Sequence, residues 1–345
     1  MSSRFYVWLA ALAALIAAPV FAQTSGAAKH AAKPAAAKSK SAIPRTPEGH
    51  PDFEGIWTNA TITPLTRPTQ FKDKATITEA EAKTFEQHDA TELAAQDGAS
   101  DGPLIAAAGS SGTGGYNALF VDRGTQLEKV DGQIRTSLIV DPPDGKMPAT
   151  TEAARKRMSA LYRNFNNYDS VHSRPASERC LIGFGSTSGP PMMPVLYNNT
   201  YEIVQTPDRI MILVEMVHDV RVIRMNAEHE PASIEKWLGD SIGHWDGDTL
   251  VVETTNIRAD NRFRGGSDRM KVIERFQRMD TGTILYRATI DDPGTYERPW
   301  TVEFPFVATP GPVYEYACHE GNYAMDDILG GARKMEGSSS PATKR

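Results

Sequence analysis

The segment from Tyr197 to Cys318 is a series of short apolar runs separated by turn residues. One of the separators is Asp246-Gly247, and Asp-Gly is a dipeptide that favours tight hairpin turns. Short strands at this spacing are typical of an antiparallel sandwich or barrel. We therefore predict a mainly β fold, an antiparallel barrel with two accessory helices and long loops.

The apolar alternation and the turn signals give the expected elements in chain order. Strands are predicted over residues 52–58, 118–130, 134–140, 197–205, 209–225 (one long strand or a bent pair), 240–245, 249–256, 270–279, 283–290, 300–306 and 313–318. Helices are predicted from Thr76, where Thr76 and Glu79 have the spacing of a capping box, to Ala95, and from Thr151 to Phe165.

The N-terminus has the order of a secretory signal peptide: a basic residue, an apolar stretch and small residues before a cleavage site. We expect cleavage after Ala22 and a periplasmic or secreted protein. The apolar stretch is shorter than the ~20 residues of a membrane-spanning helix. Residues 23–43 are predicted to be a disordered Ala/Lys/Pro linker. One barrel domain is expected over residues 44–331, followed by a disordered basic tail over residues 332–345.

The chain has two cysteines, Cys180 and Cys318. Two cysteines in an oxidising compartment usually pair, so we expect a disulfide. The alternative is a thiol nucleophile assisted by His319, although neighbours on a strand point to opposite faces. A bridge from Cys180 would also fix the loop over residues 168–194, which is longer than most loops in compact domains.

Composition and motifs exclude several classes of function. The formal net charge of −6 gives no basic footprint for nucleic acid. The glycine-rich stretch over residues 98–115 lacks the Lys-Ser/Thr of a phosphate-binding loop, so no nucleotide cofactor is expected. Asp246 and Asp248 have a calcium-ligand spacing, but the rest of that ligand pattern is absent. A hairpin turn explains both aspartates, so no metal is expected.

His218 is the first candidate catalytic residue. It interrupts the apolar face of the strand expected over residues 209–225. The alternative is a hydrogen-bonded core histidine. On the opposite face, Glu215 and Arg221 are expected to form a structural ion pair.

His244, His319 and Glu320 are the other candidate catalytic residues. His244 lies at the end of one expected strand, and His319 with Glu320 follows the last one. Chain ends at one rim of a closed barrel can meet, so we predict that the three share a pocket mouth, with His218 deeper in the same cavity. A histidine and a carboxylate can perform general acid–base catalysis. The alternative is a polar cap that fixes the chain after the disulfide.

Three segments resemble a family of uncharacterised secreted bacterial proteins. They are Gly239–Thr254 (GDSIGHWDGDTLVVET), Tyr314–Tyr323 (YEYACHEGNY) and Thr136–Gly145. The resemblance covers most of the chain after Pro51 and implies no particular activity. Gly55-Ile56-Trp57 is similar to the Gly-x-Trp that opens lipocalin barrels, which implies a calycin-like barrel.

Three functions are compatible with these residues. The first is a periplasmic barrel that binds a small apolar or aromatic molecule, with a purely apolar interior. The second is a cofactor-independent barrel enzyme, a lyase, isomerase or hydrolase, with converging histidines. The third is a structural envelope protein with a filled interior. The candidate ligand-binding residues are Trp57, Arg179, Trp245 and Tyr316.

Overall fold

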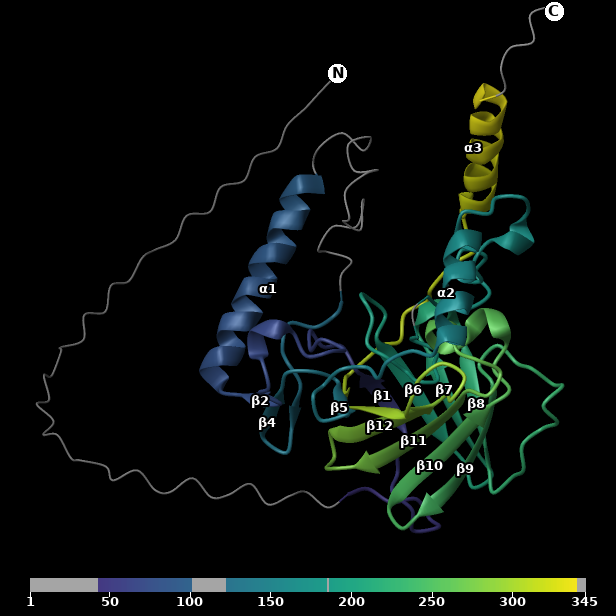
Figure 1. The fold of residues 1–345 in the computed structure, drawn as a ribbon. Helices are drawn as coiled ribbons and strands as arrows, with labels where there is room; N and C mark the ends of the chain where they lie inside the picture. The colour runs from purple at the N-terminus through teal and green to yellow at the C-terminus, as the bar shows by residue number, and fades with distance from the viewer. Residues whose placement is uncertain (1–42, 101–121, 185, 340–345) are drawn as a thin grey trace, which may run out of the picture. The chain divides into compact units, whose positions relative to one another are not determined.

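Nine β-strands close into a barrel in the computed structural model, which describes residues 43–100, 122–184 and 186–339 (Figure 1). Closure is made by β1, which pairs with β6 on one edge and with the end of β13 on the other. The expected mainly β barrel with accessory helices is confirmed. The barrel strands are β1 (Gly55–Thr58), β6 (Thr200–Gln205), β7 (Arg209–Val214), β8 (Val220–Met225), β9 (Asp240–Asp246), β10 (Thr249–Thr255), β11 (Lys271–Arg278), β12 (Thr283–Asp291) and β13 (Trp300–Ala308).

Neighbouring barrel strands are antiparallel except at one place. β8 and β9 run parallel, with Ile223 beside Ser241 and Met225 beside Gly243. A parallel pair needs a crossover connection, and residues 226–239 supply it. The barrel is thus antiparallel apart from this one pair, which the sequence pattern did not indicate.

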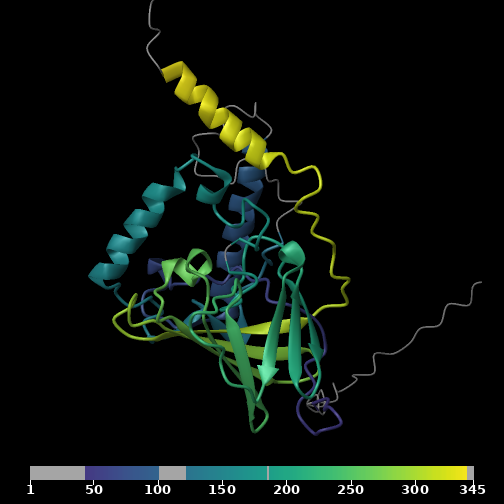
Figure 2. The same ribbon diagram turned by 90° about the vertical axis from the view of Figure 1, so that its right-hand side faces the viewer.

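The remaining elements surround the barrel. A small sheet has the order β2 (Thr76–Ile77), β4 (Gln133–Arg135), β3 (Lys129–Val130), and β5 (Ile139–Asp141) pairs with the start of β13. The helices are α1 (Glu79–Ser100), α2 (Glu152–Phe165) and α3 (Ala324–Ser339), and the short 3-10 turns are η1 (Thr69–Phe71), η4 (Val171–Ser173), η5 (Met216–His218), η6 (Ala259–Asn261) and η7 (Phe263–Gly265). Figures 1 and 2 show α2 and α3 beyond one end of the barrel, and in Figure 1 α1 begins beside β2, at the level of the barrel strands.

The predicted hairpin turns are confirmed. Gly247 and Asp248 link β9 to β10, and Gly247 has φ +58°, a backbone region that favours glycine. Asp131 and Gly132 link β3 to β4 with φ +50° and +77°, as a type I′ turn requires. The hairpin of β11 and β12 also turns at the expected residues 280–282.

The helix starts follow their capping residues. The capping box of α1 is formed by Thr78 and Glu81: the Glu81 N–H donates to Thr78 Oγ1 at 3.3 Å, and the Thr78 N–H donates to Glu81 Oε2 at 2.9 Å. It begins two residues later than predicted, because Thr76 is part of β2. For α2, the Ala154 N–H donates to Thr151 Oγ1 at 3.1 Å, which confirms the expected start.

Four expected elements differ from the structure. Residues 209–225 form two strands joined by η5, so a single face cannot be traced across His218. Of residues 118–130, only Lys129–Val130 is a strand among those that the structure describes. Residues 313–318, which were expected to form a strand, are irregular chain. α3 continues to Ser339, into the tail predicted to be disordered.

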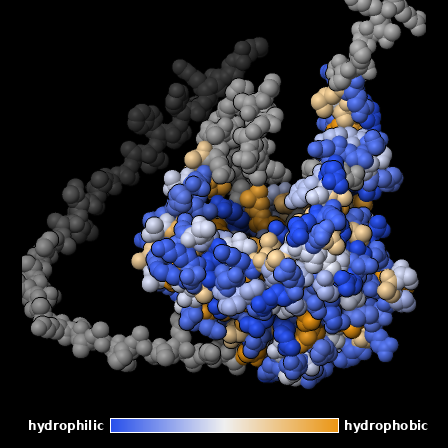
Figure 3. Space-filling model, viewed as in Figure 1, coloured by the Kyte–Doolittle hydropathy of each residue, from blue (hydrophilic) through white to orange (hydrophobic). Residues whose placement is uncertain are grey.

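The core lies inside the barrel, where alternate residues of each strand meet. Large aromatic side chains dominate it, and together with the aliphatic residues they form one continuous cluster: Trp57, Tyr201, Phe276, Tyr286, Trp300, Phe304 and Phe306. The face over β9–β12 in Figure 3 is mostly hydrophilic, with isolated hydrophobic positions. This alternation places apolar side chains on the core face of the sheet and polar ones on the outer face.

Several predictions fall outside the described residues. They concern the signal peptide, all but the last residue of the linker, most of the glycine-rich stretch and the end of the tail. Within the described ranges, no helix is long and apolar enough to cross a bilayer.

Candidate functional site

The barrel interior holds a buried ion pair. Arg221 on β8 and Glu274 on β11 are 1% and 0% exposed, and the guanidinium contacts both carboxylate oxygens. Tyr286 donates its hydroxyl hydrogen to Glu274 at 2.7 Å. Arg221 also donates to Ser241 at 3.2 Å and to Thr254 at 2.9 Å. Each charge therefore has hydrogen-bond partners, as burial requires.

A loop that precedes β6 closes one end of the interior. Met192 is fully buried, and its N–H donates to the Tyr286 hydroxyl at 3.0 Å. Asn59 donates to the Met192 carbonyl at 3.1 Å, and the Tyr201 hydroxyl donates to the Thr187 carbonyl at 3.1 Å. The interior is thus packed with the chain's own side chains, and a ligand site has to lie outside it.

Asp240, the second residue of the Gly239–Thr254 motif, has a structural role. This residue is 1% exposed, and its carboxylate accepts hydrogen bonds from Arg224 at 3.0 Å, Lys236 at 2.7 Å and the Glu230 N–H at 3.0 Å. Burial alone would raise the pKa of Asp240, but the hydrogen bonds from Lys236, the Glu230 N–H and His229 lower it. The aspartate therefore anchors the crossover between β8 and β9.

The rest of that motif also serves packing. A Cβ at Gly243 would lie 2.8 Å from Ile223 Cγ2 and 2.9 Å from Met225 Sδ, so glycine allows β8 and β9 to approach. Trp245 stacks on His50 with ring centroids 4.4 Å apart. Packing and hydrogen bonding in the barrel therefore account for Asp240, Gly243 and Trp245 of the motif.

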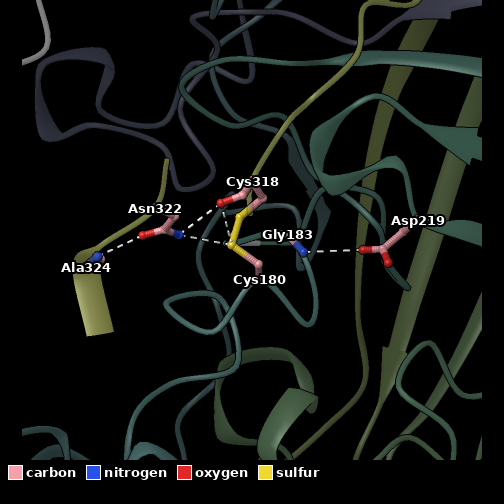
Figure 4. Close-up of a disulfide and its surroundings, with 6 residues drawn as sticks. All are labelled: Cys180, Gly183, Asp219, Cys318, Asn322 and Ala324. Carbon is pink, nitrogen blue, oxygen red and sulfur yellow. Dashed lines mark hydrogen bonds between the residues drawn. A yellow bond between two sulfur atoms is a disulfide. The ribbon is translucent and has the colours of Figure 1, made fainter. Parts of the chain in front are cut away.

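Cys180 and Cys318 form the predicted disulfide, with Cα atoms 5.8 Å apart (Figure 4). Asn322 donates to the Cys318 carbonyl at 2.9 Å and to Cys180 Sγ at 3.2 Å. Close to Cys180, the Gly183 N–H donates to the carboxylate of Asp219, directly after η5, at 3.3 Å. The disulfide therefore fastens the segment after β13 to the barrel end that carries η5.

The candidate catalytic residues are not brought together. His218 lies in η5 with φ +46° and is exposed, so it is not on a strand face. His244 is exposed near the β9–β10 turn, whereas His319 and Glu320 are exposed beyond the disulfide, at the η5 end. The six residues of β8 separate the two ends by about 20 Å. The prediction of a shared pocket mouth is therefore wrong.

Of the candidate ligand-binding residues, Tyr316 lines the pocket described below. Trp57 is a core residue whose ring lies under the Arg278 guanidinium, 4.5 Å from the ring centroid. Trp245 is occupied by its stacking contact, and Arg179 is half-buried in the turn before the disulfide. Tyr316 is half-buried and forms part of a pocket wall.

This pocket lies beside β6, at the barrel end that carries η5. It has a volume of about 500 Å³ and is walled by the start of β6, by the end of β7 and by residues 309–316. Three tyrosines, Tyr197, Tyr314 and Tyr316, line it together with two acids, Asp122 and Glu215. Among its ten described lining residues, none is Lys, Arg or His.

The two carboxyl groups set the electrostatics of the pocket. Glu215 is 4% exposed, and one of its oxygens accepts the Tyr314 N–H at 3.1 Å. Partial burial and the negative charge of Glu215 raise the pKa of Asp122 at the rim. Glu215 does not pair with Arg221, contrary to the prediction, because it points to this pocket while Arg221 points into the barrel. Among the described residues that line the pocket, two are therefore acidic and none is basic.

The sequence reasoning missed Asp122, Glu215, Tyr197 and Tyr314 as site residues. They come from segments far apart in the chain, and the disulfide-linked return of residues 309–318 places them around one cavity. The available signal was the aromatic spacing Tyr314-Glu315-Tyr316 just before Cys318.

Comparison with known proteins gives no family for this chain. No protein-family model, curated protein or solved structure matched it. Within the part of the chain that the structure describes, no group of three or more His, Cys, Asp or Glu side chains is placed to hold a metal ion. Function is therefore inferred from the chemistry of the pocket.

Proposed function

We propose that the protein binds a small aromatic molecule bearing an ammonium group in the pocket of Glu215, Tyr314 and Tyr316. One observation carries this proposal: a buried carboxylate faces a tyrosine-lined pocket in which no described lining residue is basic. Tyrosine rings attract cations through their faces. A bound ammonium would also offset the repulsion between Glu215 and Asp122.

The size of the pocket supports a ligand of this class. Small-molecule sites commonly enclose about 300–1,000 Å³ and combine aromatic walls with a few polar groups. At about 500 Å³, this pocket fits one aromatic ring with a short side chain. The ring would stack on tyrosine, which is a favourable arrangement for aromatic pairs.

The proposal includes a secreted or periplasmic location. The signal-peptide pattern of residues 1–22 supports it, and the disulfide is compatible with an oxidising compartment. Membership of the secreted bacterial family that shares the Gly239–Thr254 motif is part of the same proposal.

Calorimetric titration with 2-phenylethylamine and 2-phenylethanol tests the binding function. The two probes share a ring and differ in the ammonium group. We expect the amine to bind and the alcohol to bind at least about tenfold more weakly, because only the amine satisfies Glu215. Glu215→Gln keeps the shape of the side chain and should abolish this preference.

The matched control is Glu228→Gln, an exposed glutamate in the crossover after β8 that does not line the pocket. It should leave the titration unchanged. Equal binding of the two probes, or full amine binding by Glu215→Gln, would contradict the proposal, as would the absence of amine binding at millimolar concentration.

A second candidate function is that of a structural envelope protein. The packed interior favours it, because the described aromatic and aliphatic side chains form one continuous core inside the barrel. The same titration separates the two: a structural protein binds neither probe.

A further inference from the structure

α2 carries an apolar stripe that extends past the part of the helix packed on the barrel. Ala154 is fully buried, whereas Leu161 is 49% and Tyr162 74% exposed. Ala154, Met158, Leu161 and Tyr162 follow one side of the helix by their spacing. Together with Gly265, Met158, Leu161 and Tyr162 line a shallow groove of about 360 Å³. The exposed half of the stripe therefore offers apolar surface to a partner.

The same helix is strongly basic in an acidic protein. It contains Arg155, Lys156, Arg157 and Arg163 against a single acid, Glu152, while the chain as a whole has a net charge of −6. Arg264, which is exposed, lines the groove as well. The surface that surrounds the apolar stripe is thus positive.

The described contacts of Lys156 and Arg157 on α2 include no strong ion pair. Among the described residues, Lys156 pairs with Glu152 alone, and both side chains are more than 70% exposed, a geometry in which an ion pair contributes little. Arg157 donates to the Gly265 carbonyl at 2.9 Å and to Thr295 Oγ1 at 2.6 Å, which fixes the helix on the body. Both acceptors are neutral, and no described carboxylate pairs with the Arg157 guanidinium. The helix is therefore held rigidly with its positive charge available.

We propose that α2 is a membrane-contact helix that lies in the headgroup layer of a bilayer containing anionic lipid. A basic helix with an apolar stripe has the features of an interfacial helix. Leu161 would enter the acyl boundary, and Tyr162 has the amphipathic ring that is favoured at membrane interfaces. Anionic headgroups would neutralise the basic residues on the flanks.

The charge of α2 favours a lipid surface over a second copy of the chain. A symmetric dimer contact through this face would place the basic residues of one α2 against those of the other. Like charges in such a contact oppose association. An anionic bilayer has the complementary sign, and it accepts a small apolar patch without requiring a shaped partner surface.

Vesicle flotation of the full chain tests this proposal. The probes are phosphatidylcholine vesicles with and without phosphatidylglycerol. We expect binding to the anionic vesicles only, weakening as salt is added because the attraction is electrostatic. Leu161→Ser with Tyr162→Ser, and separately Lys156→Glu with Arg163→Glu, should each reduce the bound fraction by about tenfold.

Two controls isolate α2 from other apolar and basic positions. Val204→Ser removes an exposed apolar side chain on β6, and Arg209→Glu reverses an exposed charge on β7. Both should bind vesicles as the unaltered chain does. The proposal is overturned if the α2 variants bind like the unaltered chain, if binding ignores lipid charge, or if no vesicle binding occurs. It is also overturned if the α2 variants change only the oligomeric state in sedimentation, which would identify a protein interface.

Discussion

At the scale of single residues, Glu128 links stability to pH. It is 9% exposed beside the small sheet, and burial raises its pKa to about 8, against a smaller opposing effect of Thr61. The folded carboxyl is therefore uncharged at neutral pH, whereas the unfolded carboxyl, with its ordinary value of 4.5, is ionised. Below the unfolded pKa of 4.5 the carboxyl is protonated in both states, and its burial carries no charge penalty. Between pH 4.5 and about 8 only the unfolded state releases the proton, so the free energy of unfolding falls as the pH rises.

Glu128→Gln should remove this pH dependence. Relative to the unaltered chain, its free energy of unfolding should rise between about pH 5 and pH 8, by up to about 1.4 kcal/mol per pH unit, and then level off. Urea denaturation across this range measures the difference. The control is Glu297→Gln at an exposed position, whose free energy of unfolding should differ from that of the unaltered chain by the same amount at every pH. If the Glu128→Gln curve also runs parallel to that of the unaltered chain, the buried carboxyl is ionised in the folded state.

Glu274 is the residue on which the interior ion pair depends. Glu274→Gln leaves the Arg221 guanidinium buried without its carboxylate, and we expect a loss of roughly 3–5 kcal/mol in unfolding free energy. Asp248→Asn removes an exposed pair with Arg45 and should change the unfolding free energy little, because water screens such a pair. Chemical denaturation of both variants compares them. Equal small losses would mean that water reaches the Arg221 site.

At the scale of elements, the parallel pair of β8 and β9 depends on Gly243. Gly243→Ala would press a methyl group against Ile223 and Met225 and should destabilise the protein by about 1–3 kcal/mol. Gly282→Ala is the matched control, because the nearest atom to its added Cβ is Asp280 Oδ1 at 3.8 Å. Thermal unfolding of the two variants should differ clearly, and an equally mild effect would mean that β8 and β9 can separate without cost.

The disulfide holds the pocket segment in place. Replacing both Cys180 and Cys318 by Ser should lower the unfolding free energy by about 2–5 kcal/mol. Hydrogen exchange should accelerate at residues 309–323, including the Tyr314 N–H that donates to Glu215. The β9–β10 hairpin, at the other barrel end, should keep its protection. Unchanged exchange at residues 309–323 would show that packing alone fixes this segment.

Local elements of the fold were predictable because their signals are local. The hairpin at Gly247 and the cap of α2 at Thr151 follow from turn and capping chemistry within a few residues. The β8–β9 pairing was not predictable, because it depends on a crossover and on space that only Gly243 leaves. Strand parity across His218 failed for a related reason, since η5 reverses the chain there.

The pocket was the least predictable part of the molecule. Asp122 and Glu215 meet only because the chain returns across the barrel end after β13 and is bonded there. The histidines at strand ends gave a stronger signal in the sequence, yet β8 separates His244 from His319. The spacing of residues along the chain predicts which side chains share a face of one helix or strand. It does not predict at which end of the barrel each strand begins or ends.

At the scale of the whole molecule, we propose that the barrel is a rigid support for a binding site at its end. Its interior is occupied by the aromatic core and the Arg221–Glu274 pair, so binding cannot use the interior without unpacking it. The pocket proposed to bind the ligand instead uses chain that the disulfide holds across the η5 end. This division between a packed barrel and an external site is the central claim.

A crystal structure with bound 2-phenylethylamine tests this claim most directly. We expect the ring against Tyr314 or Tyr316 and the ammonium within about 3.2 Å of a Glu215 oxygen, with the barrel interior unchanged. Density for the probe among the core residues Phe276, Tyr286 and Phe304, or its absence from the pocket in crystals soaked to saturation, would contradict the account.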